Sequence, residues 1–275
     1  MLLGGLSYTL TGMLVRILAG QYPMFEIVFL RCVIAVFMMA PLIMRIGIGS
    51  LKTKQPVMHL IRTMIGYGGI LCWFYGVSQI PLTDYYALQF TMPLFTIAGA
   101  VPLLGERSSL KTWAAVAFGF FGALVILRPG LIDVSLGALG ALTAALCFAS
   151  INIMIKIMAR KDDPAVIVVY ANFLMIPMAL IPAMFDWVTP AWEDIPAIVG
   201  IGILGTLAQF SLTRAVALAD ARVVQPFDFA RVPFAALIGW FVFNEVSDFW
   251  TWVGAVMIFA AAYYVLAHES QRKNN

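Results

Sequence analysis

The stretch 222–233, RVVQPFDFARVP, gathers polar side chains inside an otherwise apolar part of the chain. Gln225, Asp228 and Arg231 follow one another at intervals of three residues, so a helix places them near one stripe of its surface. Charged and amide side chains are costly to bury in lipid and usually face a protein interior or a water-filled cavity. The stretch therefore predicts part of a binding site inside a membrane protein.

Asp228 and Arg231 allow two interpretations. In the functional one, Arg231 binds a carboxylate of the substrate, while Asp228 binds an ammonium group or carries a coupling proton. In the structural one, the two side chains neutralise each other as an i, i+3 pair and hold their helix in place. Gln225, one turn earlier, is a further candidate ligand, with a hydrogen bond between helices as its alternative role.

The composition is that of an integral membrane protein. Of the 275 residues, 62% are hydrophobic and 11% are charged, whereas soluble domains carry roughly 25% charged residues. Cys32, Cys72 and Cys147 lie in apolar runs, which predicts no disulfide framework, no metal site and no cofactor. The sequence has no phosphate-binding loop, H-E-x-x-H motif or G-x-S-x-G turn, which argues against an ATP-driven pump and the common hydrolases. Its scattered basic residues give no support for nucleic-acid binding.

Ten apolar runs are long enough to cross a membrane as helices. They predict an all-α integral membrane fold with short connections and no soluble domain. The runs are 2–19, 24–44, 58–79, 83–103, 109–128, 135–158, 164–185, 195–217, 222–243 and 249–267.

Basic residues predict the orientation of these helices, because Lys and Arg favour cytoplasmic loops. With the N-terminus in the cytoplasm, thirteen basic residues fall on that side, Arg62 among them, while Arg31 and Arg231 remain in the membrane. The opposite loops are acidic and rich in tryptophan. The sequence therefore predicts a multi-pass protein of a bacterial-type inner membrane, with both termini cytoplasmic.

The chain also repeats itself. Glu106 recurs as Glu245 after 139 residues, and Pro93 recurs as Pro233 after 140. Such pairs predict a duplicated five-helix unit, with one repeat over 1–134 and the second over 135–275. Because five is odd, the second repeat crosses the membrane in the opposite direction, an arrangement that places substrate sites near the midplane and supports alternating access. Coincidence among common residues is the alternative.

Motifs in a fixed order carry a resemblance to a known family. They are a YG-x-x-x-x-P-L turn from residue 75, the helix proline Pro93, Gly-Glu-Arg at 105–107, and a glycine-rich helix that ends in Arg-Pro. This run resembles an EamA domain of the drug/metabolite transporter superfamily, and the region from Pro233 to Gly254 resembles a weaker second copy. Pro23 and Arg31 fit the start of the pattern, and Pro164 and Asn172 hold the matching places in the second half.

The resemblance implies ten helices in two inverted five-helix repeats that act as a secondary carrier, mostly for the export of small metabolites. Within the superfamily, the chain is most similar to the YddG-type amino-acid exporters. Exporters of this class need no cofactor.

Aromatic and amide side chains complete the candidate substrate site. Tyr85, Tyr86 and Gln89 precede Pro93 in the run 83–103, which matches the place of the run 222–243 in the second repeat. If the two helices face each other, the site is apolar on one side and charged on the other, which suits an apolar or aromatic amino acid. The remaining candidates are Trp73, Tyr75, Asn152 and Gln209. Ordinary packing is the alternative for each of them.

A second set of residues is expected to serve structure or gating. Arg31 is expected to pair with a carbonyl or an acid. Glu106 and Glu245 lie at predicted membrane edges, where acids cap helix N-termini or anchor loops. Pro93 and Pro233 are expected to kink their helices or act as hinges.

Three functions are consistent with these patterns. The first is a carrier that exports amino acids by alternating access, has the lipid bilayer and a small-molecule substrate as its partners, and works as a monomer because the fused repeat supplies both halves. The second is a carrier for another small metabolite or a drug. The third, an intramembrane enzyme or a receptor, lacks a paired-carboxylate or histidine constellation.

Overall fold

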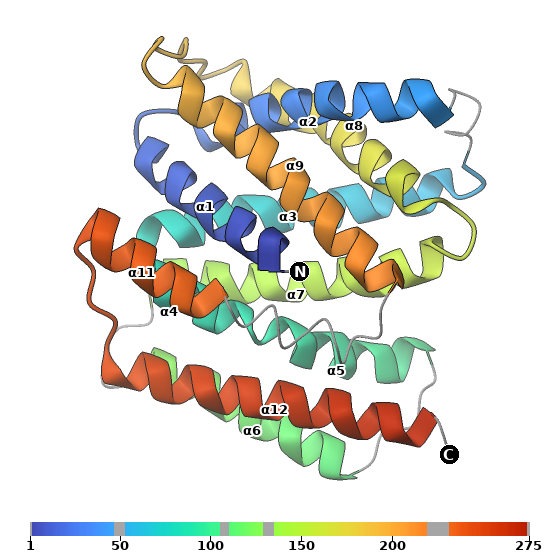
Figure 1. Cartoon of the computed structure of the whole chain (residues 1–275), viewed down its shortest axis with the longest axis vertical. Coiled ribbons are helices and arrows are strands. Elements are labelled where there is room, and N and C mark those ends of the chain that lie inside the picture. The colour runs from blue at the N-terminus through green and yellow to red at the C-terminus, as the bar shows by residue number, and fades with distance from the viewer. Residues whose placement is uncertain (1, 47–52, 105–109, 129–134, 219–230, 274–275) are drawn as a thin grey trace.

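The computed structural model describes residues 2–46, 53–104, 110–128, 135–218 and 231–273. These residues form eleven α-helices, labelled as in Figure 1, and no strand. The helices are α1 Leu2–Leu18, α2 Met24–Ile46, α3 Pro56–Gln79, α4 Leu82–Gln89, α5 Met92–Leu104, α6 Leu110–Leu127, α7 Leu136–Met158, α8 Pro164–Ala183, α9 Ile195–Leu218, α11 Arg231–Phe243 and α12 Phe249–Lys273.

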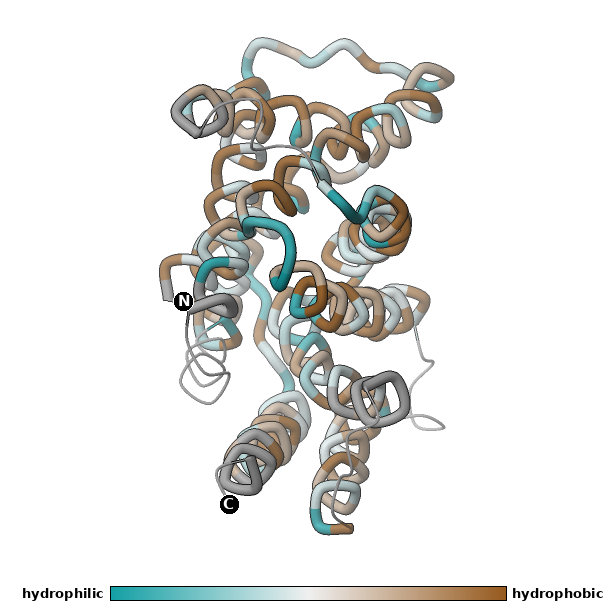
Figure 2. Tube along the Cα trace, turned by 90° about the vertical axis from the view of Figure 1, so that its right-hand side faces the viewer, coloured by the Kyte–Doolittle hydropathy of each residue, from teal (hydrophilic) through white to brown (hydrophobic). Residues whose placement is uncertain are grey.

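The predicted all-α membrane fold is confirmed. Six helices of the described residues are long and apolar enough to cross a membrane, and α1, α11 and α12 contribute shorter apolar spans. Large apolar side chains such as Phe37 and Phe241 are 75% and 72% exposed, as expected where lipid rather than water surrounds the bundle. Figure 2 shows the same pattern, with mostly apolar helices and hydrophilic stretches that are short.

The helix predicted over 83–103 is wrong in one respect, because it is broken between α4 and α5. Pro93 is the second residue of α5 and has no N–H to donate to the preceding turn. The chain instead closes α4 with tight turns, in which Phe90 and Thr91 donate to the carbonyl groups of Ala87 and Leu88. The break places the end of α4 inside the bundle.

The turns of the chain define two ends of the bundle. The end that holds Gly20, Ile80, Asp186 and Glu245 is called the Glu245 end here and lies on the left in Figure 1. The opposite end, which holds Thr53 and Asp162, is called the Asp162 end.

Helices from the two halves of the chain pack against each other. α2 lies beside α8, α6 beside α12 and α4 beside α11. In addition, α1 lies beside α9, and α3 beside α7. The largest core cluster of buried apolar side chains extends through both halves, from Val15 to Val265.

Small residues allow the closest of these contacts, between α6 and α12. A Cβ atom at Gly254 would lie 2.5 Å from the carbonyl oxygen of Gly122 and 2.5 Å from a side-chain carbon of Ile126. The backbone oxygen cannot move away without separating the helices. Glycine is therefore required at this crossing, as in other membrane bundles packed through small residues.

We expect Gly254→Ala to separate α6 from α12 and to lower the free energy of unfolding by about 1–3 kcal/mol, the usual cost of overpacking. The matched control is Gly68→Ala in α3, where a Cβ atom would meet nothing within 4 Å. Thermal unfolding of the detergent-solubilised protein measures both. Equal melting midpoints for the two variants would contradict this account of the crossing.

Candidate functional site

A cavity lies among the helices, between their middle and the Asp162 end. About 100 Å³ of it is open to the centres of water-sized molecules, enough for several waters but below the ~300–1,000 Å³ of typical ligand pockets. A metabolite therefore requires a wider form of the cavity. Its lining residues are Tyr8, Thr11, Arg31, Arg62, Gly66, Ile70, Trp73, Tyr86, Gln89, Met92, Phe148, Ile151, Asn152, Ile155, Met175, Gln209, Leu212, Thr213 and Arg231.

Several of the candidate residues from the sequence meet at this cavity. They come from six different helices, and each contributes a polar or aromatic group. Those that line the cavity are Arg31 on α2, Trp73 on α3, Tyr86 and Gln89 on α4, Asn152 on α7, Gln209 on α9 and Arg231 on α11.

The end of α4 supplies a fixed aromatic and amide wall. The hydroxyl of Tyr86 donates to the carbonyl oxygen of Tyr8 at 2.8 Å. The amide of Gln89 donates to the hydroxyl of Tyr85 at 2.6 Å and to the carbonyl oxygen of Ala141 at 3.0 Å. These bonds hold the side chains of Tyr86 and Gln89 in place at the cavity wall.

Amide groups on α7, α8 and α9 extend the polar lining. The Nδ2 atom of Asn152 lies 3.6 Å from the sulfur of Met92. The Nδ2 atom of Asn172 donates to Gln209 at 3.4 Å, and its Oδ1 atom accepts from Arg31 at 3.4 Å. The partner of Arg31 is thus a carbonyl oxygen, that of a side-chain amide.

Two candidates lie elsewhere. Tyr85 is fully buried behind the cavity wall, where its ring meets those of Trp73 and Tyr86 edge to face. Tyr75 is half-buried and packs towards Gly140 on α7. Helix geometry explains both placements, because residues next to each other on a helix point to different faces, so not all of Trp73, Tyr75, Tyr85 and Tyr86 can face the cavity.

Gln225, Asp228 and Glu106 lie outside the described residues, so the predicted contact between Asp228 and Arg231 stays a prediction. Arg231 itself begins α11, and its guanidinium lies 4.8 Å from the centre of the Tyr8 ring. That distance is within the range of a cation–π contact. Pro233 is exposed near the start of α11, and Pro93 is buried at the start of α5.

The sequence-based reasoning missed Arg62 as a site residue. It was counted as a cytoplasmic charge, whereas it is 4% exposed and lines the cavity. Its position inside the run 58–79 was the available signal, because a charge within a spanning helix is expected to face a cavity. Tyr8, Phe148 and Met175 were also missed, and apolar helices give no signal for which aromatic or methionine side chains face inward.

An ion pair joins helices at the Glu245 end. Asn244, with a φ of 52°, ends α11 in the left-handed conformation and turns Glu245 back towards the bundle. The carboxylate of Glu245 accepts from Arg16 at 2.9 Å and from the backbone N–H of Leu82 at 3.3 Å. The guanidinium of Arg16 also lies 4.7 Å from the ring centre of Phe243. One carboxylate thus joins α1, α4 and α11.

The Asp162 end holds a buried histidine. The Nε2 atom of His59 lies 2.9 Å from the carboxylate of Asp162, which also accepts from Thr53 at 2.8 Å. Burial would raise the pKa of Asp162, but the hydrogen bonds from Thr53 and His59 outweigh it and hold this pKa below its usual value. The carboxylate therefore stays ionised near neutral pH and joins the start of α3 to the turn before α8.

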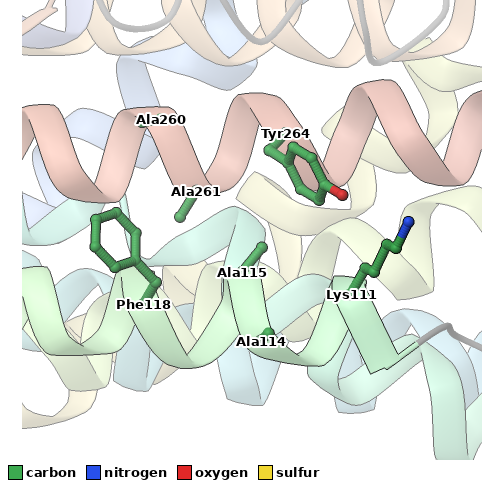
Figure 3. Close-up of a pocket in the computed structure, with 7 residues that line it drawn as sticks. All are labelled: Lys111, Ala114, Ala115, Phe118, Ala260, Ala261 and Tyr264. Carbon is green, nitrogen blue, oxygen red and sulfur yellow. The ribbon is translucent and has the colours of Figure 1, made fainter.

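A second hollow lies between α6 and α12, as Figure 3 shows. It has about 420 Å³ of space and is lined by Lys111, Ala114, Ala115, Phe118, Ala260, Ala261 and Tyr264. Phe118 and Tyr264 are 48% and 44% exposed, so the hollow lies on the outer surface of the bundle. Its lining is mostly apolar and faces lipid in a membrane, which leaves the central cavity as the candidate site.

Comparisons with known proteins identify the class. The sequence pattern of the EamA-like transporter family matches residues 1–128 and, again, residues 135–267. A solved crystal structure that is 17% identical shares the fold, with a TM-score of 0.67 over 98% of both chains.

Three bacterial relatives span nearly the whole chain. A riboflavin transporter of Vibrio cholerae is 32% identical over 99% of this chain and 93% of its own length. An S-adenosylmethionine uptake transporter of Rickettsia prowazekii is 27% identical, with 98% and 92% covered. A pseudopaline exporter of Pseudomonas aeruginosa is 29% identical, with 94% and 92% covered.

These names support the alternative expectation, a carrier of another small metabolite, better than amino-acid export. They agree with a membrane location and with transport rather than catalysis. The chain belongs to the EamA-like transporter family and is a multi-pass membrane transporter.

Proposed function

We propose that this protein carries a planar aromatic metabolite across the membrane by alternating access, with riboflavin as the first candidate. The aromatic and amide lining of the central cavity carries the proposal. Trp73 and Tyr86 offer faces on which fused rings stack, and Gln89, Asn152 and Gln209 offer donors and acceptors for ring nitrogens and carbonyl groups. The relatives named for riboflavin, 32% and 30% identical, support the same class.

S-adenosylmethionine is a weaker candidate on electrostatic grounds. Its sulfonium and ammonium groups are cationic, whereas Arg31, Arg62 and Arg231 line the cavity and no acidic residue is among its described lining residues. Like charges in a site of low dielectric repel strongly. Amino-acid export, the expectation from the YddG-type resemblance, has less support, because the relatives are named for riboflavin, S-adenosylmethionine and pseudopaline.

The proposed carrier is built from two inverted repeats, over 1–134 and 135–275. The contacts of the two halves support this proposal, because α2 meets its counterpart α8, and α6 meets its counterpart α12. Arg31 and Asn172, which hold matching places 141 residues apart, are hydrogen-bonded to each other. Matching residues touch only where they lie near a two-fold axis between the repeats.

The ion pair at the Glu245 end is proposed to be the outer gate. The acidic, tryptophan-rich turns of this end suit the outer side, and both termini then lie in the cytoplasm. The described conformation is accordingly closed to the outside, with the cavity displaced towards the cytoplasm.

Uptake into proteoliposomes tests the substrate. We expect saturable riboflavin uptake that unlabelled riboflavin inhibits and that tryptophan, methionine, threonine and S-adenosylmethionine leave unchanged. Trp73→Ala should raise the KM about tenfold, in line with the ~1–3 kcal/mol of one ring stacking on an aromatic side chain. Trp192→Ala is the matched control, because Trp192 is 89% exposed and far from the cavity. Flux of an amino acid without flux of riboflavin would return the assignment to amino-acid export.

The gate is tested by labelling at Thr83, which is 2% exposed near Glu245. In a background without Cys32, Cys72 and Cys147, Thr83→Cys should react slowly with a membrane-impermeant maleimide. Glu245→Gln should raise the rate about fivefold or more, because it removes the pair that favours the closed state.

Two further variants make the gate test specific. The double exchange Arg16→Glu with Glu245→Arg should restore slow labelling. Asp248→Asn, which removes the more exposed pair with Arg128, should change the rate less. Equal rates in the Glu245 and Asp248 variants would leave the Arg16–Glu245 pair without a gating role.

A further inference from the structure

Two buried arginines, Arg31 and Arg62, line the central cavity, and the described part of that lining offers no acid to neutralise them. Arg31 and Arg62 are 7% and 4% exposed, and both contribute to the cavity lining. No aspartate or glutamate is among the described residues of that lining. The described lining of the cavity is therefore positively charged.

Arg62 is the less satisfied of the two. Its Nε atom is buried without a hydrogen-bond partner, and no hydrogen bond or ion pair joins the side chain to another described residue. Arg31 donates one long hydrogen bond, to Asn172 at 3.4 Å, and its Nε atom also has no partner. The two guanidinium groups are close enough for their charges to act on each other.

Such an arrangement is costly in the empty protein. A guanidinium group presents five N–H donors and no acceptor, and it stays charged near neutral pH. Burial without an acceptor forfeits its hydration, and a second positive charge nearby adds repulsion. A bound anion removes both costs, because a carboxylate or phosphate accepts two parallel hydrogen bonds from one guanidinium.

We propose that Arg62 and Arg31 form an anion-binding subsite, so that the transported molecule carries a carboxylate or phosphate besides its planar ring. The ring stacks on Trp73 and Tyr86, and the acidic group binds between the two arginines. The inference deepens the proposed function, since it assigns the charge of the substrate in the same cavity. Riboflavin has neither group, so the inference favours riboflavin 5′-phosphate or another aromatic acid over riboflavin itself as the transported molecule.

Binding to the purified full-length protein tests this subsite with two matched pairs of probes. Riboflavin and riboflavin 5′-phosphate differ only in the phosphate group. Benzamide and benzoate differ in charge at nearly equal size. We expect each anion to bind about tenfold more tightly than its neutral partner, as measured by calorimetry or tryptophan fluorescence, which is the gain of one charge-assisted hydrogen-bonded pair.

Variants of Arg62 test whether this side chain causes the preference for anionic over neutral probes. Arg62→Gln should abolish the preference for the anion and leave the affinity for the neutral probe within about twofold, whereas Arg62→Lys should retain part of the preference. Arg214→Gln is the matched control, because Arg214 lies exposed on α9 outside the cavity. Retained binding of the neutral probe by Arg62→Gln shows that this variant is folded.

The outcomes separate this inference from the proposed function. If the protein binds benzoate more tightly than benzamide but binds no flavin, the anion subsite is supported and the proposal of a flavin substrate is rejected. Riboflavin bound and transported, with equal affinity for its 5′-phosphate, overturns the subsite and leaves the proposed function intact. An anion preference that persists in Arg62→Gln overturns the role assigned to this side chain.

Discussion

The cost of placing charge in hydrocarbon governs where polar groups lie in this protein. A membrane bundle cannot expose an arginine to lipid without losing its hydration. Arg31 and Arg62 therefore face the central cavity, and Arg16 and Glu245 face each other where the helices end. The same constraint leaves the outer surface apolar, including the hollow between α6 and α12.

Packing of the helices follows a second constraint, since lipid is as apolar as the helices and does not drive them together. Close approach replaces that driving force, and glycine provides it where Gly122 meets Gly254. Hydrogen bonds between halves supplement it, as between Arg31 and Asn172. The polar contact thus involves Arg31, which lines the cavity, whereas the small-residue contact joins α6 and α12 outside it.

The sequence predicts the spans and most of the polar side chains that line the cavity, because both depend on polarity along the chain. Gln89, Asn152 and Gln209 interrupt apolar runs, and each of them faces the cavity. Which of Tyr85 and Tyr86 lines the cavity depends instead on how α4 is rotated about its axis, and the pattern of polar and apolar residues does not encode that rotation. Arg62 was misassigned because its place near a helix end resembles that of a loop charge, whereas depth in the bundle depends on the packing of α3 against α7.

The proposed anion subsite also bears on how such a carrier avoids uncoupled cycling. With such a subsite, closing the empty cavity would bring Arg31 and Arg62 into a medium of low dielectric with no acid among the described lining residues, which disfavours the closed form. A bound anion neutralises them and lowers the cost of closing. Conversion between states is then faster with substrate than without it, so exchange of substrate outpaces the return of the empty carrier. If the Arg16–Glu245 ion pair is the outer gate, as proposed, it opposes opening at the other end, and its strength together with the repulsion between Arg31 and Arg62 would set which side of the membrane the cavity faces.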